Sequence, residues 1–283
     1  ERSFLFVLMT GYFLQNIYNH QHENQRTGIC SLKKEEKMRT FGIERERFII
    51  NVQKKVVSAI DDLLPRVHQI AREQGISSNL FTYELFAGQI EDRTPPCSDF
   101  KKLQKALLIN DGILLEAANG LELSYDNSEF IEKNRVVAFE VNSFDKRHQE
   151  IWTSISNDKK IAASIVAAIH VHISVFDETE VVRVLNICRK KIINELIRIG
   201  DHSNLKRIKN YQTMAGTNCI PPKFVNFLEV MEYIASKGGE KNVWDLVRYK
   251  ASTKTIEFRM FGATPNIKEI IGYVRACQNV FKI

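Results

Sequence analysis

The chain has 283 residues, of which 44% are hydrophobic, so it can bury a large core as one domain or as two closely joined ones. Its 40 Lys and Arg residues outnumber its 34 Asp and Glu residues, but the two kinds are interspersed, as on an ordinary solvated surface. The sequence contains no zinc-finger spacing, no RNA-recognition motif and no long basic arm, so nucleic acid is not an expected partner.

The cysteines are scattered singly and form no C-x-x-C pair; they are Cys30, Cys97, Cys188, Cys219 and Cys277. This odd and dispersed set predicts free thiols in a reducing compartment and not a disulfide framework or a structural zinc site. We therefore expect a cytoplasmic protein. The sequence leaves open whether copies of the chain associate as a homo-oligomer.

Residues 1–37 differ from the rest of the chain. The segment "SFLFVLMTGYFL" is apolar, but at about a dozen residues it is too short to span a bilayer. No small-residue cleavage site of the signal-peptide kind follows it. Met38 immediately precedes a well-patterned strand. We expect residues 1–37 to be an extension, either disordered or an added helix, residues 38–283 to be the main domain, and no membrane partner.

Hydrophobic periodicity predicts five helices and five strands. The helices are expected over residues 52–74, 100–119, 178–199, 221–239 and 267–281, with caps at Ser98 or Asp99, at Asp177 and at Asn266. The strands are expected over residues 40–50, 80–92, 135–142, 162–176 and 254–261. Helices separate the strands, yet several strands have one polar face. We therefore expect an α+β fold in which helices cover the outer face of a largely antiparallel sheet.

The polar faces of three of these strands carry pairs of charged or ligating side chains. Side chains alternate along a strand, so "AAIHVHISV" places His170 and His172 on one face and apolar residues on the other. In the same way "GIERERF" presents Glu44 together with Glu46. "TIEFRMF" pairs a glutamate with an arginine at the same spacing of two. Each pair alone also fits the exposed face of an ordinary half-buried strand.

A fourth segment, "YELFAGQIEDRTPP", offers Glu84 and Glu91. Their spacing of seven is odd, so in a regular strand the two carboxylates would point to opposite faces. A bend or bulge near Ala87 and Gly88 is needed to aim them the same way. The sequence therefore predicts an irregularity at this point of the strand.

If these side chains converge, five carboxylates share one cavity. Like charges disfavour ionisation, and divalent cations would remove that conflict. An oxygen-rich ligand set with few histidines suits Mg²⁺ or Mn²⁺ better than zinc. Several such ions with one arginine are what phosphoryl transfer from ATP requires. The chain has neither a Walker A loop nor a kinase signature, so the metals would carry most of the phosphate binding.

In this order, "FGIERERF", "GQIE", "HVHISVFD" and "TIEFRMFGATPN" resemble the carboxylate–amine ligases of the glutamate–cysteine ligase type, relatives of glutamine synthetase. "DHSNLKRIKNYQTMAG" resembles the polar segment after the long helix in that group. The resemblance covers about residues 40–275 and implies a glutamine synthetase-like catalytic domain with a curved, largely antiparallel sheet. It also implies that ATP phosphorylates a carboxylate, such as that of glutamate, and that an amine then attacks the acyl phosphate.

The resemblance also implies a role for each residue that matches the motifs. The positions that match metal ligands are Glu44, Glu46, Glu84, Glu91, His170 and Glu257. Arg259 matches the arginine that contacts the transferring phosphate and would be catalytic as well as nucleotide-binding. The other residues expected to contact nucleotide, phosphate or substrate are His172, Ser203, Lys206 and Arg207, with Arg147 and His148 as further candidates.

Two other interpretations stay open. A His-x-His pair with a distant glutamate also suits an enzyme with a single Fe²⁺ or Zn²⁺. That interpretation leaves five residues unexplained: Glu44, Glu46, Glu84, Glu91 and Arg259. The chain could also be a non-catalytic relative that binds a partner through the cavity. The small-molecule substrates expected for the ligase are an amino-acid carboxylate and an amine.

Overall fold

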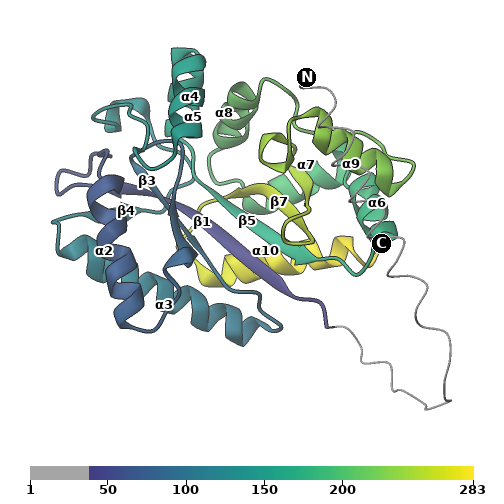
Figure 1. The fold of residues 1–283 in the computed structure, drawn as a ribbon, viewed down its shortest axis with the longest axis horizontal. Coiled ribbons are helices and arrows are strands. Elements are labelled where there is room, and N and C mark those ends of the chain that lie inside the picture. Colours follow the sequence, from purple (N-terminus) through teal and green to yellow (C-terminus); the bar gives the residue numbers. More distant parts are fainter. Residues whose placement is uncertain (1–37) are drawn as a thin grey trace, which may run out of the picture. The chain divides into compact units, whose positions relative to one another are not determined.

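The computed structural model describes residues 38–283, and the extension expected over residues 1–37 lies outside the described residues. Residues 38–283 form a domain around a seven-stranded sheet (Figure 1). Six strands follow one another in the order β2, β3, β1, β5, β7 and β6, and β4 also pairs with β1. The strands are β1 (Phe41–Ile50), β2 (Phe81–Tyr83), β3 (Gln89–Arg93), β4 (Ser124–Asp126), β5 (Ala168–Ser174), β6 (Val247–Lys250) and β7 (Thr255–Gly262). All the pairings between these strands are antiparallel, which confirms the predicted fold class.

Helices pack on both sides of these strands. They are α2 (Ile60–Glu73), α3 (Phe100–Asn119), α4 (Lys146–Ser154), α5 (Asn157–Ser164), α6 (Glu178–Ile187), α7 (Lys190–Gly200), α8 (Lys206–Ala215), α9 (Phe227–Ser236) and α10 (Ile267–Val280). Figure 1 shows α3 and α10 on one side of the central strands, and α4, α5 and α8 on the other. None of the helices in the described part of the chain is long and apolar enough to cross a membrane.

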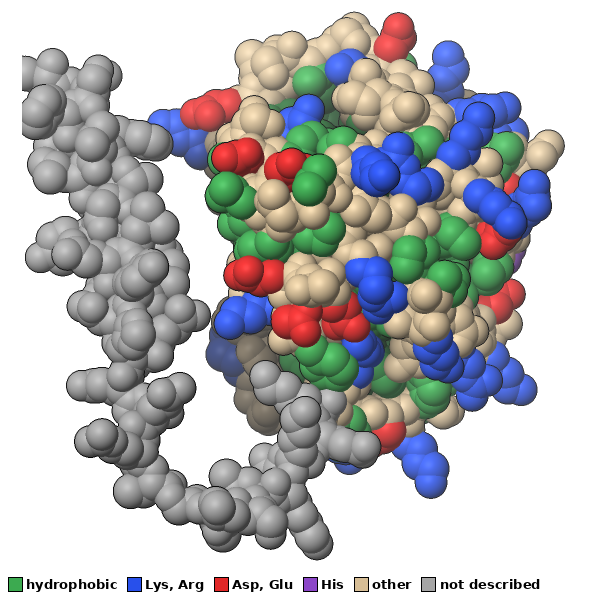
Figure 2. Space-filling model, turned by 90° about the vertical axis from the view of Figure 1, so that its right-hand side faces the viewer, with side chains coloured by type: hydrophobic (Ala, Val, Ile, Leu, Met, Phe, Trp, Pro, Cys, Tyr) green, Lys and Arg blue, Asp and Glu red, His purple; other side chains and the backbone are tan. Residues whose placement is uncertain are grey.

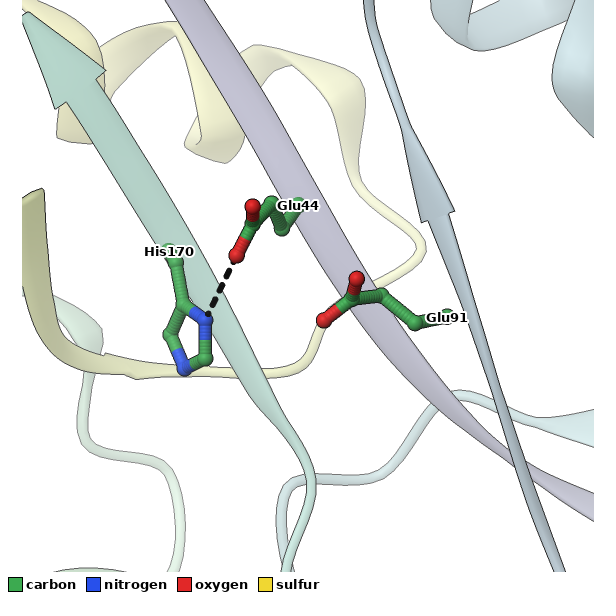
Figure 3. A group of neighbouring side chains, drawn as sticks. All are labelled: Glu44, Glu91 and His170. Atoms are coloured by element: carbon green, nitrogen blue, oxygen red, sulfur yellow. Dashed lines mark hydrogen bonds and ion pairs between the residues drawn. The ribbon is translucent and has the colours of Figure 1, made fainter. Parts of the chain in front are cut away.

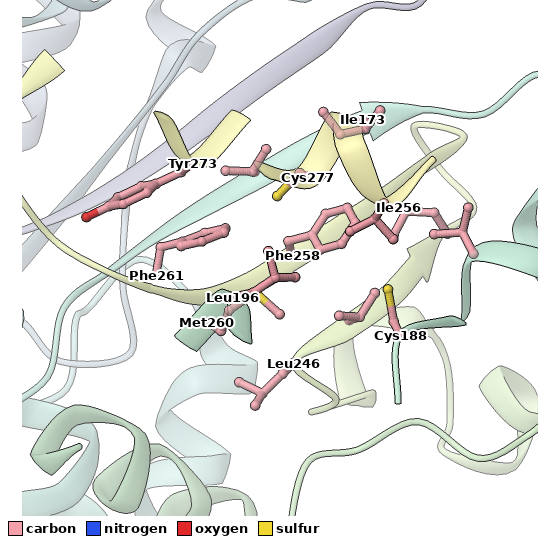
Figure 4. Close-up of a cluster of buried hydrophobic side chains, with 14 of the residues drawn as sticks. Ile173, Cys188, Leu196, Leu246, Ile256, Phe258, Met260, Phe261, Tyr273 and Cys277 are labelled. Carbon is pink, nitrogen blue, oxygen red and sulfur yellow. The ribbon is translucent and has the colours of Figure 1, made fainter. Parts of the chain in front are cut away.

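The outer face of the sheet is apolar and carries the largest core. On β5, Ile169, Val171 and Ile173 are fully buried and pack with residues of α7 and α10, whereas the two histidines between them face the other way. Figure 4 shows part of this core, where Phe258 of β7 lies near Cys277 of α10. The alternation read from the sequence therefore separates an apolar face from a polar one.

Several helix starts lie where the sequence predicted them. The side chain of Asp99 accepts a hydrogen bond from a backbone N–H in the first turn of α3, Asp177 does so for α6, and Asn266 for α10. The thiols in the described residues, Cys97, Cys188, Cys219 and Cys277, are free and buried, as predicted, whereas Cys30 lies outside those residues.

Other predicted elements are wrong in part. Residues 135–142 form no continuous strand, because Val136 and Val141 make only isolated bridges. Residues 162–164 belong to the end of α5, whose start is fixed by a hydrogen bond to the Ser156 side chain. The long helix expected over 178–199 is two helices, α6 and α7, with a break at Cys188 and Arg189.

The remaining differences concern boundaries and short elements. The first helix begins at Ile60 and not at residue 52, and α9 begins at Phe227 and not at residue 221. Five short elements were not predicted: β4, β6, α4, α5 and α8. The strand expected over residues 80–92 is divided into β2 and β3, with the bend at residues 84–88 that the spacing of its glutamates required.

Charged side chains of both signs are mixed on the face of the molecule that Figure 2 shows. On the face shown in Figure 2, Lys and Arg side chains lie in several separate groups, with acidic and hydrophobic side chains between them.

Candidate active site

A cavity of about 710 Å³ opens on the polar face of the sheet. The predicted metal ligands that line it are Glu44 and Glu46 of β1, Glu91 of β3, His170 of β5 and Glu84 of the β2–β3 connection. His172 of β5 lines it as well. Glu257 of β7 is fully buried behind its wall. The structure thus brings all six predicted ligands together from four segments of the chain.

Strand register explains this convergence. Glu46 lies directly opposite Glu91, and Glu44 lies opposite His170. On the next pair of strands, His172 lies opposite Glu257. Side chains of directly opposed residues in antiparallel strands lie on the same face and within contact distance. Each pair therefore adds two ligating groups to one surface.

His170 lies at the centre of the cluster. Its Nδ1 atom is 3.3 Å from Oε2 of Glu44 and 3.7 Å from Oε1 of Glu257, and its Nε2 atom is 3.4 Å from Oε1 of Glu46. Figure 3 shows the side chains of Glu44, His170 and Glu91 pointing toward one another from three neighbouring strands. This arrangement places nitrogen and oxygen ligands at separations that a divalent cation can bridge.

The described residues contain three groups of three side chains whose ligand atoms lie within 4.8 Å of one another. The groups are Glu44, Glu91 and His170; Glu44, His172 and Glu257; and Glu46, Glu84 and Glu91. Nε2 of His172 is buried, makes no hydrogen bond and lies 3.4 Å from Oε1 of Glu44, so its lone pair is available to a ligand. Each group contains at most one histidine, so the donor chemistry fits Mg²⁺ or Mn²⁺ better than a two-histidine iron or zinc site.

The carboxylates divide into two electrostatic classes. Burial, with repulsion from Glu91, raises the pKa of Glu46 to about 7. Burial, with repulsion from Glu46, also raises the pKa of Glu84 to about 7, and the pKa of Glu91 lies well above its usual range for similar reasons. Glu46 and Glu84 are therefore partly protonated near neutral pH in the metal-free protein. A bound dication would reverse the shifts, because it favours the ionised form.

Glu44 and Glu257 behave in the opposite way. Burial disfavours their ionisation, but cationic and hydrogen-bonding neighbours outweigh it and hold each pKa well below its usual range. For Glu257 these neighbours are Arg248 and Arg259. Burial, together with the charge of Arg259, lowers the pKa of His170 to about 3, so its imidazole is neutral at physiological pH. A neutral imidazole is the form that binds metals.

Cationic side chains surround the cluster, and sequence reasoning missed three of them. Arg248 of β6 donates two hydrogen bonds to the carboxylate of Glu257, at 2.7 and 3.1 Å. Lys250 Nζ lies 3.2 Å from Oε1 of Glu44, and Arg93 Nε donates to Glu91 at 2.6 Å. The signal was present: "VRYK" alternates charged and apolar residues, and Arg93 follows its glutamate at the strand spacing of two.

Arg259 is held at the cavity by three features. Its Nη1 atom donates to Glu257, and its Nε atom donates to the Tyr211 hydroxyl at 3.1 Å. The pairing of β5 with β7 shifts between Ile169 and Val171, whose partners are Phe261 and Phe258, so β7 contains one extra residue at this point. Bulges of this kind re-aim side chains beside active sites. Arg259 therefore lines the cavity in a fixed orientation.

The residues predicted from the polar segment after the long helix lie elsewhere. Arg207 is buried behind Arg259, and its Nη2 atom donates to that residue's carbonyl oxygen at 3.3 Å. Ser203 and Lys206 line a second cavity, where Lys206 pairs with Glu132 at 3.0 Å. The structure therefore does not bring Ser203 and Lys206 to the carboxylate cluster.

The two weaker candidates do reach the main cavity. Arg147 and His148 lie at the start of α4 and line the cavity wall. Nδ1 of His148 lies 2.8 Å from Nδ2 of Asn142, and the same amide donates to the carbonyl oxygen of Glu84. Arg147 hydrogen-bonds to Asn242, which belongs to a short 3₁₀ helix, η3 (Glu240–Asn242). These contacts connect α4 to the β2–β3 connection through Asn142 and to η3 through Asn242.

No protein-family model matches the sequence, and neither does any curated protein. Solved structures do match. A bifunctional glutathione synthetase from Pasteurella multocida aligns with a TM-score of 0.55 and 13% identity over 86% of this chain and 38% of its own. A glutamate–cysteine ligase from Francisella tularensis in complex with AMP aligns with a TM-score of 0.52 and 11% identity over 87% of this chain and 66% of its own.

This chain shares their fold. The likeness confirms the predicted α+β architecture with a largely antiparallel sheet, at a level of identity that shows the fold alone. The chain spans between 38% and 66% of the length of these two structures.

Proposed function

We propose that the protein is an ATP- and Mg²⁺-dependent ligase, with Mn²⁺ as the other suitable cation, that joins the carboxylate of an amino acid such as glutamate to an amine. The proposal rests on three overlapping ligand groups with Arg259 beside them. Glu44 belongs to the first and second groups, and Glu91 belongs to the first and third. The fold shared with ATP-dependent ligases supports it. Several closely spaced divalent cations with an arginine suit the transfer of a phosphoryl group.

In the proposed reaction, a carboxylate oxygen attacks the γ-phosphorus of ATP, and ADP leaves. The amine nitrogen then attacks the carbonyl carbon of the acyl phosphate, inorganic phosphate leaves, and the nitrogen loses a proton. Bound divalent cations would neutralise charge on the β- and γ-phosphates. Arg259 has free N–H groups besides those that contact Glu257 and Tyr211, and these can donate to the transferring group as its charge develops.

The residues that would hold the cations are those of the three groups: Glu44, Glu46, Glu84, Glu91, His170, His172 and Glu257. Arg248 and Lys250 hold the carboxylates of Glu257 and Glu44 in place by direct hydrogen bonds. Outer partners of this kind orient metal ligands and influence their affinity.

The first test is the dependence of nucleotide binding on a divalent cation. Calorimetry should detect ATP binding with Mg²⁺ present and lose it with a chelator. Equal ATP affinity in both conditions would contradict the proposal. Screening pairs of amino acids and amines for ADP release then distinguishes a ligase from a non-catalytic relative. A ligase releases ADP only with the correct pair, whereas a non-catalytic relative binds Mg-ATP and releases none.

A further inference from the structure

Directly behind the carboxylates, on the outer face of the sheet, lies a second buried group of charges. Arg45 and Arg47 of β1, Asp92 of β3 and Asn110 of α3 are 2%, 7%, 1% and 1% exposed. Along β1 the sequence "ERER" thus sends its glutamates to the cavity and its arginines to the opposite side. The remainder of this face is apolar, so the charged group interrupts a hydrophobic core.

Asp92 is the centre of this outer network. Its carboxylate accepts hydrogen bonds from Arg45 at 2.7 and 3.1 Å, from Arg47 at 3.1 Å and from the Asn110 amide at 2.9 Å. The same amide donates to the carbonyl oxygen of Arg93 at 2.9 Å, and both arginines also reach Asp111 of α3. The network therefore joins β1, β3 and α3 at one point.

The inner face alone does not specify this register of β1 and β3. It places Glu46 directly opposite Glu91, and like charges opposed across two strands destabilise the pairing. The same register places Glu44 opposite Arg93, with Arg93 Nε 3.5 Å from Oε1 of Glu44. A slip of two residues would place Glu46 opposite Arg93 instead, so it would only exchange one attractive pair for another. Such a slip keeps every side chain on its own face, so hydrophobic burial opposes it only weakly.

The outer network distinguishes the native register. In that register Arg45 lies directly opposite Asp92, with Arg47 close enough to bond the same carboxylate. A slip of two residues in one direction would place Asp92 opposite Arg47 and leave Arg45 opposite Thr94. A slip in the other direction would place Asp92 opposite Ile43. The second slip takes Arg47 away from Asp92, and a buried charge without its partner is strongly unfavourable. The first slip keeps both arginines beside Asp92 but shifts β1 or β3 along α3. It therefore breaks either the contacts of Arg45 with Asp111 and the Leu107 carbonyl oxygen or those of Asn110 with β3.

We propose that Arg45, Arg47, Asp92 and Asn110 are positioning residues that hold Glu46 opposite Glu91, so that the cation ligands are assembled before any cation binds. The inference rests on the proposed function, because it assigns this network a role in cation binding. Buried charges of this kind add little stability compared with apolar side chains of similar volume. Their contacts instead favour one register of β1 relative to β3.

The test measures Mn²⁺ binding to the full chain by the loss of the free-ion electron paramagnetic resonance signal, well below the unfolding temperature. Asp92→Asn removes the charge that both arginines share and should weaken Mn²⁺ binding about 10- to 100-fold, as for other outer partners of metal ligands. Asn110→Leu removes only the hydrogen bonds from the Asn110 amide to Asp92 and to the Arg93 carbonyl oxygen. It keeps both arginine–aspartate contacts. It should therefore fold and weaken Mn²⁺ binding by about tenfold, the lower end of that range.

The matched control is Asp126→Asn. Asp126 also lies on a strand that pairs with β1 and accepts a hydrogen bond from an arginine, Arg135, at 2.7 Å, but it lies outside the cavity. This variant should unfold at a lower temperature and bind Mn²⁺ normally. The inference would be overturned if Asn110→Leu, or a folded Asp92→Asn, bound Mn²⁺ with the affinity of the wild type. It would also be overturned if Asp126→Asn lost as much Mn²⁺ affinity as those variants. A wild-type chain that binds no Mn²⁺ would overturn the proposed function, and the inference with it.

Discussion

At the residue scale, Arg259 gives the sharpest expectation. Its planar guanidinium is fixed by Glu257 and Tyr211, so its orientation does not have to be created during the reaction. Arg259→Lys keeps the charge but loses this geometry. Turnover measured by ADP release should fall about 100-fold, as on loss of one preorganised donor, with a much smaller change in ATP affinity. Unchanged turnover would exclude a role for Arg259 in phosphoryl transfer, and Arg183→Lys on α6, outside the cavity, serves as control.

The raised pKa of Glu84 predicts a pH-dependent effect on stability. The folded pKa of about 7 exceeds the ordinary value of 4.5, so the folded, metal-free protein favours the protonated form. This contribution is complete below about pH 4.5 and is lost as the pH rises through 7. Glu84→Gln cannot ionise, so it should be more stable than the wild type at pH 8 and lose that advantage by pH 5.

Urea denaturation of both proteins with a chelator at several pH values measures this difference. The difference in unfolding free energy should change by less than about 1.4 kcal/mol per pH unit, the limit for one proton. A difference that stays constant between pH 5 and pH 8 would mean that the Glu84 pKa is not raised. A constant value would also remove the argument that the carboxylates repel one another in the absence of a cation.

The site could be predicted where the ligands lie on strands with a clear alternation. Glu44, His170 and Glu257 follow the spacing of two, and strand pairing then brings them together. The roles of Ser203 and Lys206 could not be predicted in this way. They precede or begin a helix, α8, whose direction is set by tertiary packing that no local pattern records.

At the scale of elements, the β2–β3 connection makes a testable contribution. A Cβ atom on Gly88 would lie 2.5 Å from the buried ring of Phe86 and 2.8 Å from Cγ1 of Val56. Gly88→Ala should therefore cost about 1–3 kcal/mol of stability, as other overpacking changes do. Because Glu84 lies on the same connection, Mn²⁺ binding should weaken as well.

Gly112 in α3 provides the matched control for that change. A Cβ atom there meets nothing within 4 Å, so Gly112→Ala should stabilise the helix by about 0.5–1 kcal/mol and leave Mn²⁺ binding unchanged. Chemical denaturation of the two variants should give shifts of opposite sign. Two shifts of the same sign would show that the space around Gly88 is not the cause.

Elements with a long and consistent period could be predicted, but short or interrupted ones could not. β1 and α3 are long and lie close to their predicted bounds. β6 has only four residues, too few for a two-residue period to stand out from chance. The break at Cys188 and Arg189 leaves the hydrophobic period of α6 and α7 nearly continuous, so nothing in the pattern marks it.

At the scale of the whole molecule, one sheet separates two kinds of buried environment. Its outer face packs against helices with apolar side chains, and its inner face holds the cation ligands. The strands that carry ligands are the central ones, β3, β1, β5 and β7, which are neighbours in the sheet order. Rigid central strands suit a site whose ligands must stay within a fraction of an ångström of their positions.

The part of the chain that the structure describes should be sufficient for folding and for nucleotide binding. Residues 38–283 contain the sheet, the cores and the cavity described above. A chain that begins at Met38 should therefore fold and bind Mg-ATP with the affinity of the full chain. It retains Arg39, whose guanidinium pairs with Glu180 at 2.7 Å and lies over the rings of Phe176 and Phe281.

Arg39→Ala in the shortened chain is the informative comparison. Losing these contacts should lower the melting temperature by about 2–4 °C for each kcal/mol lost, so thermal denaturation can detect a cost of this size. The shortened chain itself should melt within that same interval of the full chain, because no contact described above is removed. A fall of more than about 10 °C on shortening alone would exceed what one lost contact explains, and residues 1–37 would then have to belong to the fold.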